Sequence, residues 1–212
     1  MNTVAIVDYG MGNLRSVSKA IEHVGGDARV IVTSDPAVVA AADRVVVPGQ
    51  GAMPDCMAEL ESRGLRDAVI RAAAEKPFLG ICIGLQMLFE HSAEGDVPGL
   101  GILPGQVLRF PAEAMVGPDG NRLKVPHMGW NEVVQARPHA LWQDIDDGAR
   151  FYFVHSYYVE AGDPGSITGS TDYGIPFTSA VAQANIFAVQ FHPEKSAQAG
   201  LALLGNFLRW NP

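Results

Sequence analysis

The sequence has 212 residues, of which 48% are hydrophobic and 18% are charged, and its net charge is −8. These proportions are typical of a compact domain with its own hydrophobic core, and we expect residues 1–212 to form a single domain. The acidic charge disfavours nucleic acid or an anionic membrane surface as the main partner.

The cysteine content and the hydropathy of the sequence indicate in which cellular compartment the protein is expected. Cys56 and Cys82 are the only cysteines, too few for a disulfide framework, and neither lies in a zinc-binding pattern. The N-terminal segment has no basic stretch before its apolar residues, as a signal peptide would, and no apolar run reaches the roughly 18 residues of a membrane span. The sequence therefore predicts a reduced, cytoplasmic protein without a membrane span, metal ion or cofactor.

The first 90 residues alternate β-strand and α-helix patterns. Strands are expected at residues 3–8, 28–33, 44–49 and 78–81, and helices at residues 14–24, from Pro36 onward and at 54–75. Repeats of this kind imply parallel strands joined by crossovers, with helices on both faces of the sheet.

Beyond residue 100 the pattern changes to short strand-like runs separated by Gly, Pro and Asp. These runs cover residues 122–130, 149–160, 166–173, 177–183 and 186–192. A closing helix is expected at residues 197–210, with Ser196 as its N-cap. The predicted fold is therefore α/β: an open, mostly parallel twisted sheet with helices on both faces and an antiparallel or mixed C-terminal section.

Cys82 lies between Gly80 and Gly84, where a predicted strand turns into a helix whose apolar spacing continues to Phe89. The spacing G-x-C-x-G is that of a nucleophile elbow, in which glycines permit close backbone approach. The following helix N-terminus would lower the thiol pKa and offer N–H groups to an oxyanion. Taken alone, a buried and inert thiol is the competing interpretation.

His192 is the histidine best placed to act with this thiol, because it ends a predicted strand and is followed by Pro193 and Glu194. Residues i and i+2 leave a strand on the same side, so Glu194 would orient the imidazole while the other ring nitrogen faces a nucleophile. An isolated His-Pro-Glu is equally compatible with a strand-end histidine beside a solvated Glu-Lys pair.

The segment Pro48-Gly49-Gln50-Gly51 follows another predicted strand. Glycine-flanked amides can turn toward a bound anion or a developing oxyanion. A tight turn between strand and helix is the alternative that the segment alone leaves open.

With these three motifs in this order at strand ends, the chain resembles the class I (triad) glutamine amidotransferases over essentially its whole length. The resemblance implies that Cys82 attacks the carboxamide of glutamine, that His192 moves the protons and that Glu194 orients His192. It also implies an oxyanion site at Gln50, Gly51 and Ile83, and glutamine contacts at Gly49, Gly51, Gln86, Ser156 and Tyr157.

Four further segments, DYGMGNLRSV, PHMGWN, FVHSYY and FHPEKS, look like those of glutaminase subunits that pass ammonia to a separate (β/α)₈ cyclase subunit in histidine biosynthesis. This resemblance implies a heterodimer whose docking face includes Asn13, Trp130, Tyr152 and Lys195. Gln50 departs from the pattern, since such subunits more often carry a small apolar residue there.

Three alternatives remain at this point. The same triad could serve pyridoxal phosphate synthase or another synthase, the chain could be a cysteine peptidase or related hydrolase, or it could be a binding subunit with a degenerate site. Cys56 lies in a helical pattern without charged neighbours that would activate it, and we predict a packed structural thiol.

Overall fold

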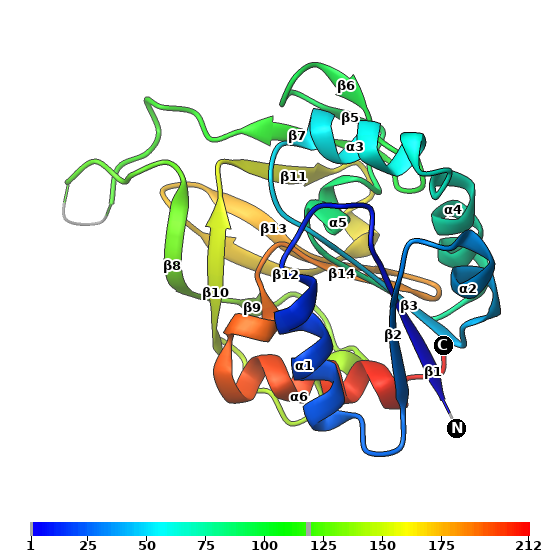
Figure 1. Ribbon diagram of the computed structural model, residues 1–212. Coiled ribbons are helices and arrows are strands. Elements are labelled where there is room, and N and C mark those ends of the chain that lie inside the picture. The colour runs from blue at the N-terminus through cyan, green and yellow to red at the C-terminus, as the bar shows by residue number, and fades with distance from the viewer. Residues whose placement is uncertain (1, 118–119) are drawn as a thin grey trace.

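The computed structural model of the protein describes residues 2–117 and 120–212. Within these residues one sheet contains strands from both halves of the chain, as Figure 1 shows. Its parallel half has the strand order β2-β1-β3-β4-β14. The bounds are β1 (Thr3–Val7), β2 (Arg29–Thr33), β3 (Arg44–Gly49), β4 (Phe78–Cys82) and β14 (Ile186–Val189).

The sheet continues from β14 into a mixed section, in which β13, β11, β7, β5 and β6 follow in order and β12 and β9 branch from β13. Every pair in this section is antiparallel except β5 with β7. The bounds are β5 (His91–Ser92), β6 (Val97–Pro98), β7 (Gly105–Arg109), β9 (Val134–Gln135), β11 (Tyr157–Ala161), β12 (Ile167–Asp172) and β13 (Pro176–Gln183).

A separate antiparallel ribbon pairs β8 (His127–Glu132) with β10 (Arg150–His155). The run at residues 149–160, which reads as one strand in the sequence, is thus two strands, β10 in the ribbon and β11 in the main sheet. Ser156 is the single residue between them. The chain therefore changes sheets at a residue predicted to contact glutamine.

Helices cover both faces of the parallel half. In Figure 1, α1 (Leu14–Val24, blue) and α6 (Ala197–Arg209, red) lie side by side on one face, while α2 (Pro36–Ala41) and α4 (Arg66–Glu75) contact each other on the opposite face. The strands β3 and β4 lie between these layers and are buried along their whole length. The predicted α/β fold is confirmed.

Some predicted boundaries are wrong for identifiable reasons. The helix expected at residues 54–75 is two helices, α3 (Met53–Ser62) and α4, because Gly64 between them has a φ of +65°. The helix after Cys82, α5, is a single turn (Ile83–Gln86) and stops well short of Phe89. The strand expected at residues 122–130 begins only after Pro126, which has no N–H for a ladder.

Ser196 does not cap α6 through its side chain, contrary to the sequence-based expectation. Its hydroxyl donates to the carbonyl of His192 at 2.6 Å and accepts the backbone N–H of Tyr152 at 3.0 Å. Ser196 therefore joins the segment carrying His192 to the strand β10. The segment is a 3₁₀ turn, Pro193–Lys195.

No described helix combines the length and apolar character that crossing a membrane demands. The predicted single domain includes residues 1, 118 and 119, which lie outside the described residues.

Candidate active site

Cys82 is the last residue of β4 and has φ 57° and ψ −107°, a backbone conformation that is costly for a residue with a side chain. The neighbouring glycines make this turn possible. A Cβ on Gly84 would lie 1.8 Å from the carbonyl oxygen of Val47, and one on Gly80 would lie 2.6 Å from the carbonyl oxygen of Gly84. Any side chain at these positions would push the elbow off β3, so the thiol is held at a strained turn by close backbone contact.

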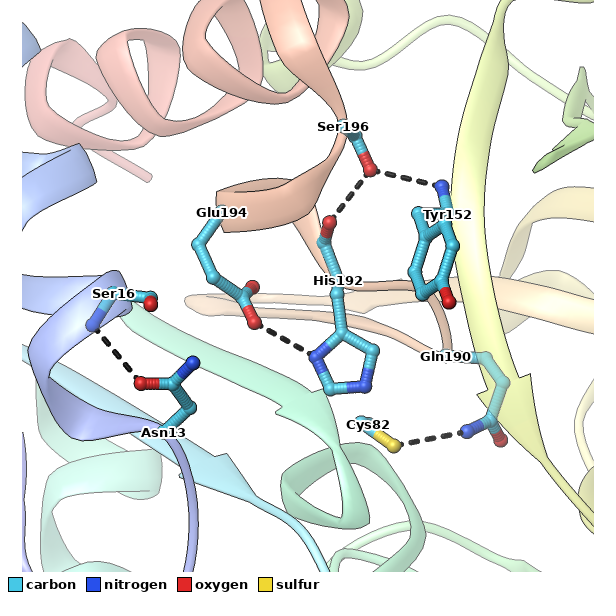
Figure 2. A network of polar contacts seen from close by, with 8 residues as sticks. All are labelled: Asn13, Ser16, Cys82, Tyr152, Gln190, His192, Glu194 and Ser196. Carbon is cyan, nitrogen blue, oxygen red and sulfur yellow. Dashed lines mark hydrogen bonds and ion pairs between the residues drawn. The ribbon is translucent and has the colours of Figure 1, made fainter. Parts of the chain in front are cut away.

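His192 and Glu194 form a buried pair at the adjacent strand end. The Nδ1 atom of His192 lies 2.8 Å from Oε1 of Glu194, and their side chains are only 2% and 1% exposed. The other ring nitrogen, Nε2, is buried without a hydrogen-bond partner among the described residues. Figure 2 shows this edge of the imidazole directed toward the thiol of Cys82.

The electrostatic environment favours the charged imidazolium of His192. Burial lowers the pKa of His192, but the interaction with Cys82, with a further contribution from Glu194, outweighs burial and raises this pKa to about 10. A histidine with these neighbours holds a proton beside the sulfur and can release it to a leaving group.

A cavity of about 440 Å³ opens in front of the thiol. Its lining includes eight residues predicted to act on glutamine: Gln50, Gly51, Cys82, Ile83, Gln86, Ser156, Tyr157 and His192. Glu194 lies behind His192 and not in the wall. Gly49 also lies outside the lining, packed so tightly that a Cβ there would be 2.3 Å from the hydroxyl of Tyr9.

The segment after β3 is fixed from behind by two buried side chains. The hydroxyl of Tyr9 donates to the carbonyl of Pro48 at 2.8 Å, and the thiol of Cys56 lies 3.6 Å from the carbonyl of Gln50. Gly51 has a φ of +108°, which a residue with a side chain rarely adopts. The backbone of this segment, rather than the Gln50 side chain, is thus what the surrounding residues hold.

Gln86 is 2% exposed and is held from two sides. Its Nε2 donates to the carbonyl of Tyr157 at 3.1 Å and to Oε1 of Gln190 at 3.0 Å. Because both partners are acceptors, the orientation of the amide is determined, and its Oε1 remains buried without a partner in the described structure. Gln86 therefore keeps one buried acceptor without a partner, in a residue that lines the cavity.

Sequence reasoning missed two residues of the site. Gln190 is fully buried, and its Nε2 lies 3.7 Å from the sulfur of Cys82. The strand expected at residues 186–192 ends at Val189, so the strand alternation used for His192 and Glu194 does not hold there, and no regular spacing marks Gln190. Glu94 lines the cavity from a loop, where no periodic signal exists.

Three of the four residues predicted to face a partner lie together. Trp130 on β8 is 47% exposed and meets the ring of Tyr152 edge to face, with 6.1 Å between centroids. The Nζ atom of Lys195 lies 5.9 Å from the centroid of Tyr152. Asn13 comes from the start of α1, where its Oδ1 accepts the backbone N–H of Ser16 at 3.2 Å. Figure 2 shows Asn13 and Tyr152 on opposite sides of His192.

Among residues 2–117 and 120–212, no cluster of three or more His, Cys, Asp or Glu side chains has an arrangement that could hold a metal ion.

Comparison with known protein families and solved structures identifies the general class of protein. The family model described as glutamine amidotransferase class-I matches residues 5–210. Among solved structures of low sequence identity, a glutamine amidotransferase aligns with a TM-score of 0.69 at 17% identity, covering 93% of this chain and 94% of the other. A chain of PurLQS from Thermotoga maritima aligns with a TM-score of 0.69 at 15% identity, covering 98% of each chain. At this identity the two structures support the fold alone.

Similarity to curated proteins identifies the subfamily within this class. An imidazole glycerol phosphate synthase subunit HisH from Aromatoleum aromaticum is 71% identical over 212 residues and is covered over its full length. The HisH subunit from Dechloromonas aromatica is 70% identical over 210 residues, which are 99% of this chain and 97% of that protein. The chain therefore belongs to the class I glutamine amidotransferases and, within that class, to the HisH subunits of imidazole glycerol phosphate synthase.

Proposed function

We propose that the chain hydrolyses glutamine to glutamate and ammonia with Cys82, His192 and Glu194, as the glutaminase subunit of imidazole glycerol phosphate synthase in histidine biosynthesis. The observation that carries the proposal is the strained elbow at Cys82, directly below a buried His192 whose Nδ1 is bound by Glu194. A cavity of about 440 Å³ in front of the thiol has room for a single amino acid.

The reaction follows from this geometry. The thiolate of Cys82 attacks the side-chain carbonyl carbon of glutamine and forms a C–S bond. As the tetrahedral intermediate collapses, the C–N bond breaks and the Nε2 proton of His192 passes to the departing ammonia. Water then attacks the thioester, His192 takes its proton, and breaking the C–S bond releases glutamate and restores the thiolate. Glu194 keeps the proton-transferring nitrogen aimed at the sulfur.

The negative charge of each tetrahedral intermediate needs hydrogen-bond donors. We assign these to backbone N–H groups of Ile83, at the start of α5, and of the segment containing Gln50 and Gly51. The assignment is supported by their place in the cavity wall and by the tight packing of Gly49 behind them. We place this role on the backbone of Gln50 and not on its side chain.

The amino-acid end of glutamine meets the opposite wall. We assign the unpartnered Oε1 of Gln86 as an acceptor for the α-ammonium group, and the carboxylate of Glu94, which also lines the cavity, as a favourable charge for the same group. Ser156 and Tyr157 complete this wall.

We infer that a partner subunit uses the ammonia. Relatives that are about 70% identical are subunits of imidazole glycerol phosphate synthase, and we infer that this chain likewise docks on a (β/α)₈ cyclase subunit, which forms imidazole glycerol phosphate and aminoimidazole carboxamide ribotide. The docking face consists of the exposed Trp130, Lys195 at the cavity and Tyr152 next to Lys195, and Asn13 extends it. Membership in this family argues against pyridoxal phosphate synthase as the partner.

We further propose that residues 1–212 act as one glutamine amidotransferase domain, supported by the continuous sheet and by the family match to residues 5–210. The cytoplasm suits the enzyme, because reducing conditions keep its thiol free.

The test is glutamate release from glutamine by the chain alone, and by the chain with the cyclase subunit and an analogue of the cyclase substrate. Strong stimulation that the Cys82→Ser variant abolishes supports chemistry and partner together. If the rate of glutamate release is the same with and without the cyclase subunit, the proposed partner is wrong but the proposed glutaminase chemistry stands. If no glutamate is released in either mixture, the whole proposal is wrong.

A further inference from the structure

Two buried histidines that the reaction does not use face each other across the β8–β10 ribbon. Nδ1 of His127 lies 2.9 Å from Nε2 of His155, and the two residues are 3% and 6% exposed. The rings of Tyr173 and Phe153 stack on His127 with centroid distances of 3.9 and 4.8 Å. Phe110 and Phe177 enclose His155 from other sides, with centroid distances of 5.2 and 5.1 Å, and His155 also lines the cavity in front of Cys82.

This enclosure keeps both histidines neutral. Burial lowers the pKa of His127 to about 4 and that of His155 to about 3. The titratable groups that face the pair are the phenol of Tyr173 and the imidazole of His192, and a positive charge on His192 disfavours protonation of His155 further. Because each neutral ring has one N–H, the position of that proton decides which hydrogen bonds exist.

The contacts of Asn131 determine which ring nitrogen of His127 carries the proton. Asn131 accepts the backbone N–H of Glu132 at its Oδ1 (2.8 Å), and its Nδ2 donates to the carbonyl of Asp172 (2.8 Å). These partners fix the amide, so its second N–H points at Nε2 of His127, 3.3 Å away. Nε2 of His127 is therefore an acceptor, and the proton of His127 is on Nδ1.

The contact between His155 and the carbonyl of Tyr157 independently places a proton on Nδ1 of His155. Nδ1 of His155 lies 2.8 Å from the carbonyl oxygen of Tyr157, which can only accept, so His155 carries its proton on Nδ1. Nε2 of His155 is then free to accept the Nδ1–H of His127. Both rings hold the proton on Nδ1, the opposite of the form that predominates for free histidine in water.

The carbonyl of Tyr157 continues the chain into the active site. It also accepts the Nε2–H of Gln86, which donates its second N–H to Gln190, whose Nε2 lies 3.7 Å from the sulfur of Cys82. A series of hydrogen bonds therefore connects Asn131, next to the exposed Trp130, with the nucleophile. Its direction reverses at the Tyr157 carbonyl, which accepts from His155 on one side and from Gln86 on the other.

We propose that His127 and His155, each held in the neutral form with its proton on Nδ1, are positioning residues that fix the Tyr157 carbonyl and the Gln86 amide for glutamine binding. The inference rests on the proposed glutaminase function. Losing the series frees Gln86 to rotate and misplaces the acceptor for the α-ammonium group. The affinity for glutamine should suffer more than the chemistry at Cys82.

The first test reads the protons directly, by long-range ¹H–¹⁵N correlation spectra of the histidine rings in the full chain between pH 5.5 and 8. We expect His127 and His155 each to show a protonated Nδ1 and an unprotonated Nε2 at every pH. Titration of either ring in this range, or a proton on either Nε2, would overturn the proposal. This readout does not depend on glutaminase activity.

The second test compares two substitutions at His127 in the complex with the cyclase subunit. His127→Phe keeps a flat ring between Tyr173 and Phe153 but gives no donor, and should raise KM for glutamine about tenfold with a smaller change in kcat. His127→Asn places an amide N–H where Nδ1 was, and should recover most of the lost affinity.

The outcomes separate the two proposals. If the wild-type complex releases no glutamate, the proposed function fails whatever the spectra show. If the wild type is active and the phenylalanine variant keeps its KM, or the asparagine variant is no better than the phenylalanine variant, the positioning role is wrong. If the phenylalanine variant does not fold, the spectra of the wild type decide.

Discussion

The carboxylate of Glu94 accepts the backbone N–H of Met53, the first residue of α3, at 2.9 Å, while Glu94 also lines the cavity in front of Cys82. The helix α3 has no side-chain cap of its own, and it follows directly after the segment that carries Gln50 and Gly51. One residue thus satisfies a free helix N–H and contributes charge to the site.

These two roles of Glu94 can be separated. Glu94→Gln keeps an acceptor for Met53 but removes the charge, so KM for glutamine should rise about tenfold while the melting temperature stays the same. Glu94→Ala should show the same KM effect and also lower the melting temperature by about 2–4 °C through the lost cap. Steady-state kinetics and calorimetry provide both readouts. An unchanged KM in the glutamine variant would leave Glu94 with a structural role only.

The buried charge of Glu194 should appear in both activity and stability. Glu194→Gln keeps an acceptor for His192 but no charge, and kcat should fall by about a hundredfold or more. Cys82 and, after it, Glu194 raise the pKa of His192 to about 10 in the folded state, so the stabilisation that comes from the charged imidazole is complete below pH 6.5 and disappears as the pH rises toward 10.

The advantage of the wild type over Glu194→Gln in melting temperature should accordingly be largest near pH 6 and shrink by pH 10. Thermal unfolding of both proteins at the two pH values measures this. Equal differences at the two values would mean that Glu194 does not act through the charge of His192.

The two thiols should react very differently. Cys56 is fully buried, and burial raises the pKa of its thiol to about 12, so almost no thiolate is present near neutral pH. A glutamine-mimicking electrophile should label Cys82 and leave Cys56 unmodified, as read by peptide mass spectrometry. The Cys82→Ser variant, which should take up no label, is the control. Label on Cys56 in the folded wild type would contradict the structural role.

Docking should depend on Trp130 without affecting the fold. Trp130→Ala should weaken binding to the cyclase subunit about thirtyfold, since large aromatic residues dominate protein interfaces, and should leave the melting temperature unchanged because the side chain is half exposed. Val32→Ala is the matched control, as Val32 is an exposed apolar residue (42%) on the edge strand β2. Titration calorimetry with the purified cyclase measures both; equal affinities would remove Trp130 from the interface.

The parallel strands could be predicted from the sequence because their apolar runs are continuous and buried on both faces, as in residues 44–49 and 78–81. The elbow and the His-Pro-Glu turn were also predictable, since both depend on local residue spacing. Gln190 was not predictable in this way, because β14 ends at Val189 and the backbone beyond it does not follow strand alternation.

What the sequence could not provide was long-range geometry. Nothing near Glu94 indicates that its carboxylate reaches α3, forty-one residues earlier in the chain. Ser196 has the residue type of an N-cap, yet the carbonyl of His192 and the N–H of Tyr152 compete successfully for its hydroxyl. Such choices are decided by tertiary contacts that local propensity does not record.

The division of residues 149–160 into two strands has a consequence for how this protein can change. Tyr152, on the face proposed for the cyclase, belongs to β10, and Tyr157, at the glutamine wall, begins β11, with a single residue separating the strands. A substitution that reshapes the ribbon to accept a different partner therefore also moves the wall that selects the substrate. An engineer who wants an orthogonal pair of subunits will have to redesign both surfaces together.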